Sequence, residues 1–423
     1  MGRLRLRRAE RGQVEMHLAA LEDLVTSDHR VRLVWSFVER LDITPLLAGL
    51  RSFEGASGAP ATDPRILLAL WLFATLEGVG SAREIERLCE RDLAYKWIAG
   101  GVSVNHHTLA DFRSNAGAFL DDVLSRSVAA LVEAKVVDLS CLAVDSLRVR
   151  ASAGSGSFRR RETLRELEAL ARARIEDLKG APEGEGTRRR AAQERAASER
   201  AERLAAALAA VDEIEAARAA EAESQRRKTP KRRAPARGST TDAQARIIRM
   251  ADGGFAPGYN LQVKTDPKAG VVVGLEVSAD ASDRGKLEPA VAEMERRYGR
   301  RPEVILADEG YDSHKDIEAV EAKDTAVHVP LPKDPARQAP RPGDSDGVKA
   351  WKTRMMGEAG KGAYALRINT EHAHAQMRNH GLTQMPVRGL RKVTAVALLF
   401  AVATNLLLHG PVLIEALNGA LIA

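Results

Sequence analysis

Three acidic residues stand at positions where a sheet enzyme could use carboxylates. Asp145 ends the apolar run CLAVD, Asp308 ends the run VILAD, and Glu371 follows in a later helical segment. Open α/β sheets bind ligands at the carboxyl ends of their strands, and carboxylate oxygens suit Mg²⁺, which also accepts water and phosphate oxygens. Two such ions about 4 Å apart can clamp a phosphodiester displacement. A single strand-end aspartate more often caps a turn, so only the three acids together indicate a hard-cation site.

The segment around Glu371 adds groups that could hold phosphate. Tyr364, Arg367, Glu371 and Arg378 occur at helical spacing in YALRINTEHAHAQMR and would share one helix face. The glutamate would then bind metal while the tyrosine and both arginines contact phosphate oxygens. The spacing by itself favours a plainer interpretation, a solvated helix face with an Arg–Glu pair at i,i+4.

Other kinds of catalytic site find little support in the sequence. His372 and His374 are two residues apart and would face different sides of a helix, which argues against zinc. The two cysteines, Cys89 and Cys141, lie outside any CxxC pattern, so a disulfide scaffold is excluded and a reducing cytosol fits. No Ser/His or Cys/His arrangement indicates a covalent nucleophile.

The elements that must position these residues fall into two classes. Residues 14–136 show helical periodicity, with Asp63-Pro64 starting one helix and Thr108 suited to cap another from Leu109. Short helices of this kind fit a helix-turn-helix DNA reader and any small helical bundle equally.

From residue 136 onward the pattern predicts an α/β fold with a mixed sheet, interrupted by a helical insertion. The expected elements are a strand at 136–144, two polar helices within 159–223 separated at 180–186, a hairpin of strands 259–264 and 271–277, a helix at 287–298 capped by Ser282 or Asp283, a strand at 304–307, a helix from 313, a strand at 326–330, a loop at 331–347 and further helices. Asp283 could also support the site of the three acids, although the sequence favours the N-cap role.

Composition narrows the class of protein. The chain has 423 residues, of which 44% are hydrophobic and 29% charged, so it can bury a core and is neither collagen-like nor wholly disordered. Aromatic residues make up only 4%, which argues against a stacking platform for single-stranded nucleic acid.

The net charge of +6 is concentrated in one segment. Residues 159–237 carry 21 Lys/Arg and 15 Asp/Glu, a surplus equal to that of the whole chain. The segment ends in an acid-free basic run, Arg226, Arg227, Lys228, Lys231, Arg232, Arg233 and Arg237. Such a run could bind phosphate, although a solvated linker is an equally good interpretation.

No segment of the sequence predicts a membrane anchor. The basic start MGRLRLRRAERGQ is not followed by the apolar stretch of a secretory signal. The longest apolar run, residues 393–408, has 16 residues and contains Thr394, Thr404 and Asn405, whereas a membrane span needs about 20. We therefore expect a buried helix in a cytoplasmic protein.

Taken together, these blocks resemble the DDE transposases of bacterial insertion sequences. The family signature Y-x2-R-x3-E-x6-K is matched by Y-x2-R-x3-E-x6-R, and ARIIRMADGGFAPGYNLQV, ILADEGYDS and RNHGLTQMPVRGLRKV look like further family blocks in the same order. The N-terminal helices ending in NHHTLADFR resemble the family's amino-terminal domain. Only residues 159–228 fall outside the resemblance. Arg378 replaces the signature lysine and keeps its charge, but a planar guanidinium differs from a lysine ammonium.

The resemblance implies a ribonuclease H-like catalytic core in which Asp145, Asp308 and Glu371 are the catalytic, metal-binding acids. The implied cofactor is Mg²⁺, as two ions, with Mn²⁺ able to substitute. Tyr364, Arg367 and Arg378 would contact the DNA of the element end. Water would attack the phosphodiester there, and the freed 3′-hydroxyl would attack target DNA without a covalent protein–DNA intermediate. Double-stranded DNA would be the partner, on the bacterial chromosome, and a homodimer or higher oligomer would hold the two ends.

The expected organisation has three parts. Residues 1–135 form a helical, DNA-binding N-terminal domain, residues 136–158 and 238–423 form the ribonuclease H-like domain, and residues 159–237 form a charged helical insertion with a basic linker.

The sequence is also compatible with two other kinds of function. A catalytically inactive relative could bind DNA and only occupy element ends, although all three acids are present. The helices of 159–223 could drive assembly, a role compatible with catalysis. They lack a sustained a/d heptad of large apolar residues, since the series Leu164, Leu167, Leu170, Ile175 and Leu178 serves only the first helix. We expect this insertion to pack on itself or on DNA.

Overall fold

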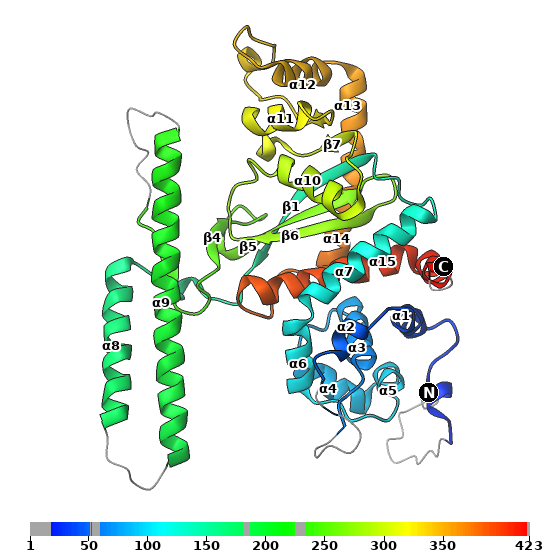
Figure 1. Ribbon diagram of the computed structural model, residues 1–423, viewed down its shortest axis with the longest axis vertical. Coiled ribbons are helices and arrows are strands. Elements are labelled where there is room, and N and C mark those ends of the chain that lie inside the picture. Colours follow the sequence, from blue (N-terminus) through cyan, green and yellow to red (C-terminus); the bar gives the residue numbers. More distant parts are fainter. Residues whose placement is uncertain (1–17, 51, 53–59, 181–186, 225–233, 421–423) are drawn as a thin grey trace, which may run out of the picture.

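The structure is a computed structural model that describes residues 18–50, 52, 60–180, 187–224 and 234–420. Figure 1 shows three regions: a cluster of N-terminal helices, a mixed β-sheet with helices packed around it, and a long helical hairpin that projects to one side. The chain enters the sheet after the N-terminal helices, leaves it for the hairpin and then returns. The predicted order of a helical region, an α/β region and a helical insertion within it is confirmed.

The N-terminal region packs short helices around one almost fully buried helix, α3. Asp63 accepts a hydrogen bond from the amide of Arg65, and Pro64 takes the first turn of α3, as the sequence predicted. The helices are η1 (Leu21–Leu24), α1 (Arg30–Glu39), α2 (Thr44–Leu47), α3 (Pro64–Leu76), α4 (Ala82–Arg91), α5 (Leu93–Ala99), α6 (His106–Asn115) and α7 (Gly117–Glu133).

Helix α6 begins earlier than the sequence predicted. Its N-cap is Asn105, whose side chain accepts a hydrogen bond from the amide of His107, whereas Thr108 lies inside the helix. No helix-breaking residue separates Asn105 from Leu109, so the earlier cap adds a turn. Near the other end of α6, the guanidinium of Arg113 is buried, donates to the carbonyl of Gly80 and stacks on the ring of Trp71 at 4.2 Å.

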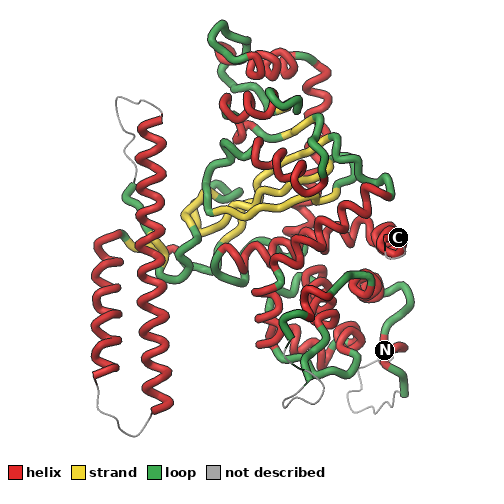
Figure 2. The backbone as a smooth tube through the Cα atoms, viewed as in Figure 1, coloured by secondary structure: helices red, strands yellow, loops and turns green. Residues whose placement is uncertain are grey.

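The strands form one main sheet (Figure 2), which is mixed and has β1 at its centre. The strand order is β4-β5-β1-β7-β8, and β6 also pairs with β5. β1 runs antiparallel to β5 and parallel to β7, which is parallel to β8. The predicted hairpin is confirmed as β5 and β6. The strands are β1 (Cys141–Arg150), β4 (Arg246–Arg249), β5 (Phe255–Asp266), β6 (Val271–Ser278), β7 (Val304–Leu306) and β8 (Ala326–His328).

Helices surround this sheet and connect its strands. Those that follow the insertion are α10 (Leu287–Tyr298), η3 (Glu309–Tyr311), α11 (His314–Glu321), η4 (Pro335–Arg337), α12 (Asp346–Met356), α13 (Glu358–Tyr364), η5 (Ala365–Arg367), α14 (Ile368–Asn379) and α15 (Leu390–Ala420). Strand β8 ends at His328, so it is shorter than the predicted 326–330.

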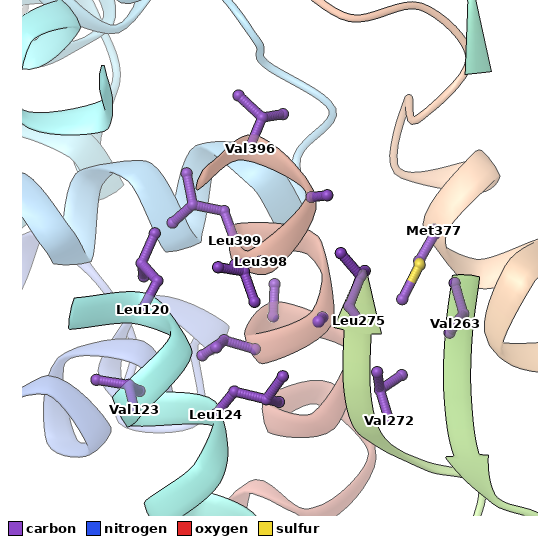
Figure 3. Close-up of a cluster of buried hydrophobic side chains, with 14 of the residues drawn as sticks. Leu120, Val123, Leu124, Val263, Val272, Leu275, Met377, Val396, Leu398 and Leu399 are labelled. Carbon is purple, nitrogen blue, oxygen red and sulfur yellow. The ribbon is translucent and has the colours of Figure 1, made fainter. Parts of the chain in front are cut away.

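Helix α15 forms the centre of the main hydrophobic core. It lies between α7 and β6 (Figure 3), and the labelled side chains come from α7 (Leu120, Val123, Leu124), the strands (Val263, Val272, Leu275), α14 (Met377) and α15 (Val396, Leu398, Leu399). Leu390–Asn418 is long and apolar enough to cross a membrane, yet most of it is buried in the protein. The polar residue Asn405 is tolerated within this apolar run because its side chain makes two 2.8 Å hydrogen bonds with the backbone of Val272.

The hairpin consists of α8 (Arg161–Gly180) and α9 (Thr187–Ser224), close to the predicted bounds. Its base is closed by β2 (Phe158–Arg159), which follows η2 (Ser155–Ser157) and pairs antiparallel with β3 (Gly238–Ser239). The two helices share a small apolar core of their own, which includes Leu164, Leu204 and Val211. A Cβ atom at Gly238 would collide with the carbonyl oxygen of Ala207, so only glycine lets β3 approach α9 this closely.

Most of the predicted phosphate-binding run lies outside the described residues. These are Arg226, Arg227, Lys228, Lys231, Arg232 and Arg233. Arg237 is described and is exposed beside the base of the hairpin.

A buried ionic network joins α7, the sheet and α10. Glu293 on α10 accepts hydrogen bonds from Lys264 of β5 and, at 2.6 Å, from Arg297. Arg297 also donates a hydrogen bond to Asp121 of α7. Burial alone would raise the pKa of Glu293, but the charges of Lys264 and Arg297 hold that pKa below its usual value of 4.5. The network fixes the position of α10 because neither cation is left without a carboxylate.

We predict that Glu293→Ala lowers the free energy of unfolding by about 3 kcal/mol or more, because it leaves two buried cations short of an anion. Since the folded-state pKa lies below the unfolded value, the contribution of Glu293 is present above about pH 4.5 and is lost as the pH falls below it. Urea midpoints of both proteins between pH 4 and pH 8 measure this. Glu295→Ala is the matched control, because Glu295 forms an exposed pair with Arg301. Equal midpoints for the Glu293 variant and the control would contradict the prediction.

We also predict that the hairpin can be removed without loss of the remaining fold. Arg159 pairs directly with Gly238, so joining these residues by Asn-Gly would make a two-residue β-turn. The shortened protein should keep a cooperative thermal transition, measured by circular dichroism. Loss of that transition would show that the main core needs the hairpin.

Candidate active site

Asp145 lies within β1, and Asp308 lies just beyond the end of the neighbouring strand β7. β1 and β7 are parallel, and Ala143 lies opposite Leu306. Each aspartate follows two residues later, so the same offset carries both carboxylates to one level of the sheet. β1 continues to Arg150, whereas β7 stops at Leu306 and the chain turns at Asp308. Asp308 accepts a 2.9 Å hydrogen bond from the amide of Gly310, which fixes this turn.

Burial and neighbouring charges shift the pKa values of both aspartates. Burial raises the pKa of Asp145 to about 6; the charge of Arg367 opposes this rise and the charges of Asp308 and Glu371 add to it. Burial also raises the pKa of Asp308, against the hydrogen bond from Gly310. Clustered, desolvated carboxylates with raised pKa values are typical of functional sites.

Arg367 links Asp145 to Glu371. One guanidinium nitrogen lies 3.3 Å from Oδ2 of Asp145, and the other donates to Oε1 of Glu371 at 2.9 Å. The arginine side chain is 13% exposed, whereas that of Glu371 is 58% exposed. Nε of Arg367 is buried and has no hydrogen-bond partner in the described residues. The guanidinium is therefore held between a buried and a solvated carboxylate.

The helix that carries these residues is less regular than predicted. Tyr364 ends α13, residues Ala365–Arg367 form a 3₁₀ turn, and only then does α14 begin. The structure brings Tyr364 close to Arg367, with the guanidinium carbon 5.9 Å from the ring centre. Arg378 is exposed two turns beyond Glu371 and makes no side-chain hydrogen bond or ion pair with the described residues. The predicted common face of four residues is thus partly disrupted at the 3₁₀ turn.

The donor set fits a divalent cation, although its present arrangement is not that of a closed metal site. Asp145, Asp308 and Glu371 offer oxygen ligands of the type that Mg²⁺ prefers, and a cation would relieve the mutual repulsion that raises the pKa of Asp145. In the described part of the chain, no three His, Cys, Asp or Glu side chains converge closely enough to hold one ion. Arg367 pairs with two of the three acids, so metal binding requires Glu371 to leave it.

His374 is a neighbour of Asp145 that the sequence analysis did not assign to the site. It is buried one turn beyond Glu371, and its Nδ1 lies 3.7 Å from Oδ2 of Asp145. Burial lowers the pKa of His374 to about 4, so the ring is neutral at physiological pH. Its Nε2 is buried without a hydrogen-bond partner among the described residues. Helical spacing from Arg367 and Glu371, at i+7 and i+3, is the signal that could have identified it.

Asp283 has a different position from the one predicted. Asp316 of α11, rather than Ser282 or Asp283, accepts hydrogen bonds from the first amides of α10, at 2.9 Å and 3.1 Å. Asp283 instead turns into the sheet beside Asp308 and is 5% exposed. A cap from a neighbouring helix leaves no signal in local sequence, and this is why the prediction was wrong.

We predict that Glu371→Gln leaves the free energy of unfolding within about 1 kcal/mol of wild type, because Glu371 is itself 58% exposed and Arg367 keeps its pairing with Asp145. Thermal and urea midpoints of the two proteins measure the difference. A larger loss would mean that the Arg367–Glu371 pair is a structural requirement, which would complicate its use as a probe of activity.

Comparison with protein families agrees with this geometry. Residues 19–115 match the family described as a transposase domain (DUF772), and residues 224–406 match the transposase DDE domain. The second match begins near the end of the hairpin and includes β5, β7 and α14, and therefore Asp308 and Glu371. No curated protein and no solved structure shows significant similarity to the chain. From these two matches and from the signature around Glu371, we conclude that the chain belongs to the DDE transposases of insertion sequences.

Proposed function

We propose that this transposase cuts DNA at insertion-sequence ends and joins those ends to target DNA, with Asp145, Asp308 and Glu371 as its catalytic acids. The observation that carries the proposal is the buried carboxylate of Asp145 on β1 beside the half-buried carboxylate of Asp308, which follows the parallel strand β7, with Glu371 linked to Asp145 by Arg367. Removing carboxylates from water costs free energy. A divalent cation bound between them would offset that cost.

The three carboxylates would hold Mg²⁺, with Mn²⁺ as a substitute and two ions as the expected number. When bound, such ions supply Lewis-acid stabilisation of the charge that develops on phosphate oxygens. The part of the protein is to hold its carboxylates on a rigid strand pair and to orient the phosphodiester, because positioning accounts for much of phosphoryl-transfer catalysis.

We assign the DNA contacts to Tyr364, Arg367 and Arg378. Once Glu371 leaves Arg367, the guanidinium is free to donate two parallel hydrogen bonds to a phosphate. Tyr364 lies beside Arg367, where its hydroxyl can donate to the same strand. Arg378 is exposed about 10 Å beyond Glu371 along α14, so it would meet a different phosphate of the element end.

The reaction would proceed in two displacements of the same kind. Water attacks the phosphodiester at the element end, the P–O bond to the 3′ oxygen breaks, and that oxygen leaves as a 3′-hydroxyl. The hydroxyl then attacks a phosphodiester of target DNA and displaces a new 3′ oxygen. Neither step needs a protein nucleophile.

Each of the three predicted parts of the chain has its own proposed function. We propose that residues 1–135 bind DNA, that residues 136–158 and 238–423 form a ribonuclease H-like catalytic domain, and that the 159–237 insertion packs on itself or on DNA. The mixed sheet with β1 at its centre supports the catalytic assignment. The protein would act in the bacterial cytoplasm as a homodimer or larger assembly, since two element ends must be held together.

The test is cleavage of a labelled duplex that carries the element's end, in Mg²⁺, in Mn²⁺ and in EDTA. We expect metal-dependent nicking, and we expect Asp308→Asn and Glu371→Gln each to reduce its rate by at least about a hundredfold, equivalent to about 2.7 kcal/mol in the activation barrier. Both variants should still bind the duplex in a gel-shift assay, because neither acid attracts phosphate.

Glu309→Gln is the matched control. Glu309 is next to Asp308 but lies in the 3₁₀ turn and is about half exposed, so this variant should nick within about twofold of wild type. Duplex binding without nicking under every metal condition would instead identify the chain as an inactive relative that only occupies element ends.

A further inference from the structure

Asp283 is a buried carboxylate to which the proposed reaction gives no role. It lies between β6 and α10, and its side chain accepts hydrogen bonds from four donors. Oδ1 accepts from the amides of Asn260 and Gln262 at 2.8 Å and 2.7 Å, and Oδ2 accepts from Ser146 at 3.2 Å and Arg148 at 3.4 Å. A carboxylate is buried this completely only when such partners replace its water.

The first set of contacts leads to Asp145. Ser146 lies opposite Gln262, and Arg148 lies opposite Asn260, so the four donors form two cross-strand pairs of β1 and β5 that are separated by one pair and share a face of the sheet. Ser146 directly follows Asp145, and its amide donates to Oδ1 of Asp145 at 2.9 Å. Asp283 therefore holds β1 at the residue that orients the Asp145 carboxylate.

The second set of contacts leads to Asp308. The carbonyl oxygen of the Gln262 side chain accepts from the hydroxyl of Tyr311, which is fully buried in the turn that follows Asp308. A Cβ atom on Gly310 would lie 2.9 Å from Oδ1 of Asp308 and 3.5 Å from Oδ2 of Asp283. The two carboxylates thus approach each other across a glycine backbone, with little space for any side chain between them.

We propose that Asp283 is a positioning residue that sets the separation of Asp145 and Asp308, through Ser146 on one side and through Gln262 and Tyr311 on the other. It thereby sets the affinity of this carboxylate pair for a divalent cation. The inference rests on the proposed function in taking those two aspartates as metal ligands. Groups that orient ligands in this way typically change metal affinity by 10–100-fold when they are removed.

The experiment measures Mn²⁺ binding to the full-length protein without DNA, by the loss of the electron paramagnetic resonance signal of free Mn²⁺. We expect Asp283→Asn and Tyr311→Phe each to weaken Mn²⁺ binding by about 10–100-fold. Because both act through Gln262, the double variant should lose less affinity than the product of the single losses. Asp280→Asn is the matched control, since Asp280 lies in the same loop but is exposed, and it should bind within about twofold of wild type.

A purely structural role predicts a different pattern: a lower thermal midpoint with an unchanged Mn²⁺ dissociation constant for the folded protein. That pattern would overturn the inference, as would wild-type affinity in both single variants. If Asp283→Asn fails to fold, Tyr311→Phe, which removes one hydroxyl, decides the question alone.

The outcome can be separated from that of the proposed function. Asp145→Asn should abolish the strong Mn²⁺ site, because Asp145 is one of the two proposed ligands, and a variant that kept the site would overturn the inference. A wild-type protein that binds no Mn²⁺ would overturn it as well. A protein that binds Mn²⁺ as expected but does not nick DNA would leave the inference standing and refute the proposed activity.

Discussion

The parallel pairing of β1 with β7 is the constraint on which the site depends. It places Asp145 and Asp308 at one level of the sheet, where burial raises the pKa of both carboxylates. The surrounding residues stabilise the negative charges of these two carboxylates. Arg367 neutralises part of it from α14's side, Gly310 and Ser146 donate backbone amides, and Asp283 ties the two strands and the turn together.

Arg367 connects two of the three acids. Its guanidinium pairs with Asp145 and Glu371 together. Glu371 remains largely solvated, so little energy opposes its movement toward the aspartates. The two aspartates are therefore held by β1 and by the turn that follows β7, and the most exposed acid is on a helix, as expected of a site that must admit a cation and a DNA strand.

The contacts that stabilise the fold are distinct from those that hold the carboxylates. The main core surrounds α15, which packs between α7 and the sheet, and the Glu293 network fixes α10 at a distance from the carboxylates. The hairpin has its own small core and joins the sheet region through the short β2–β3 pair. Changes to the hairpin can therefore alter what the protein contacts without altering the strands that hold Asp145 and Asp308.

The sequence by itself determined the order of elements, the hairpin of β5 and β6, the two insertion helices and the burial of the α15 run, because each depends on local periodicity, caps and turns. It also indicated Asp145, Asp308 and Glu371 through expected strand ends and a family signature, although the strand predicted at 136–144 is Cys141–Arg150 in the structure and Asp145 lies in its middle. Only the tertiary structure decided which cation faces those acids, that His374 lies beside Asp145, that Asp316 rather than Asp283 caps α10, and that Asp283 joins the sheet. These are contacts between residues far apart in the chain, and no local pattern encodes the distance between two segments until the sheet has brought them together.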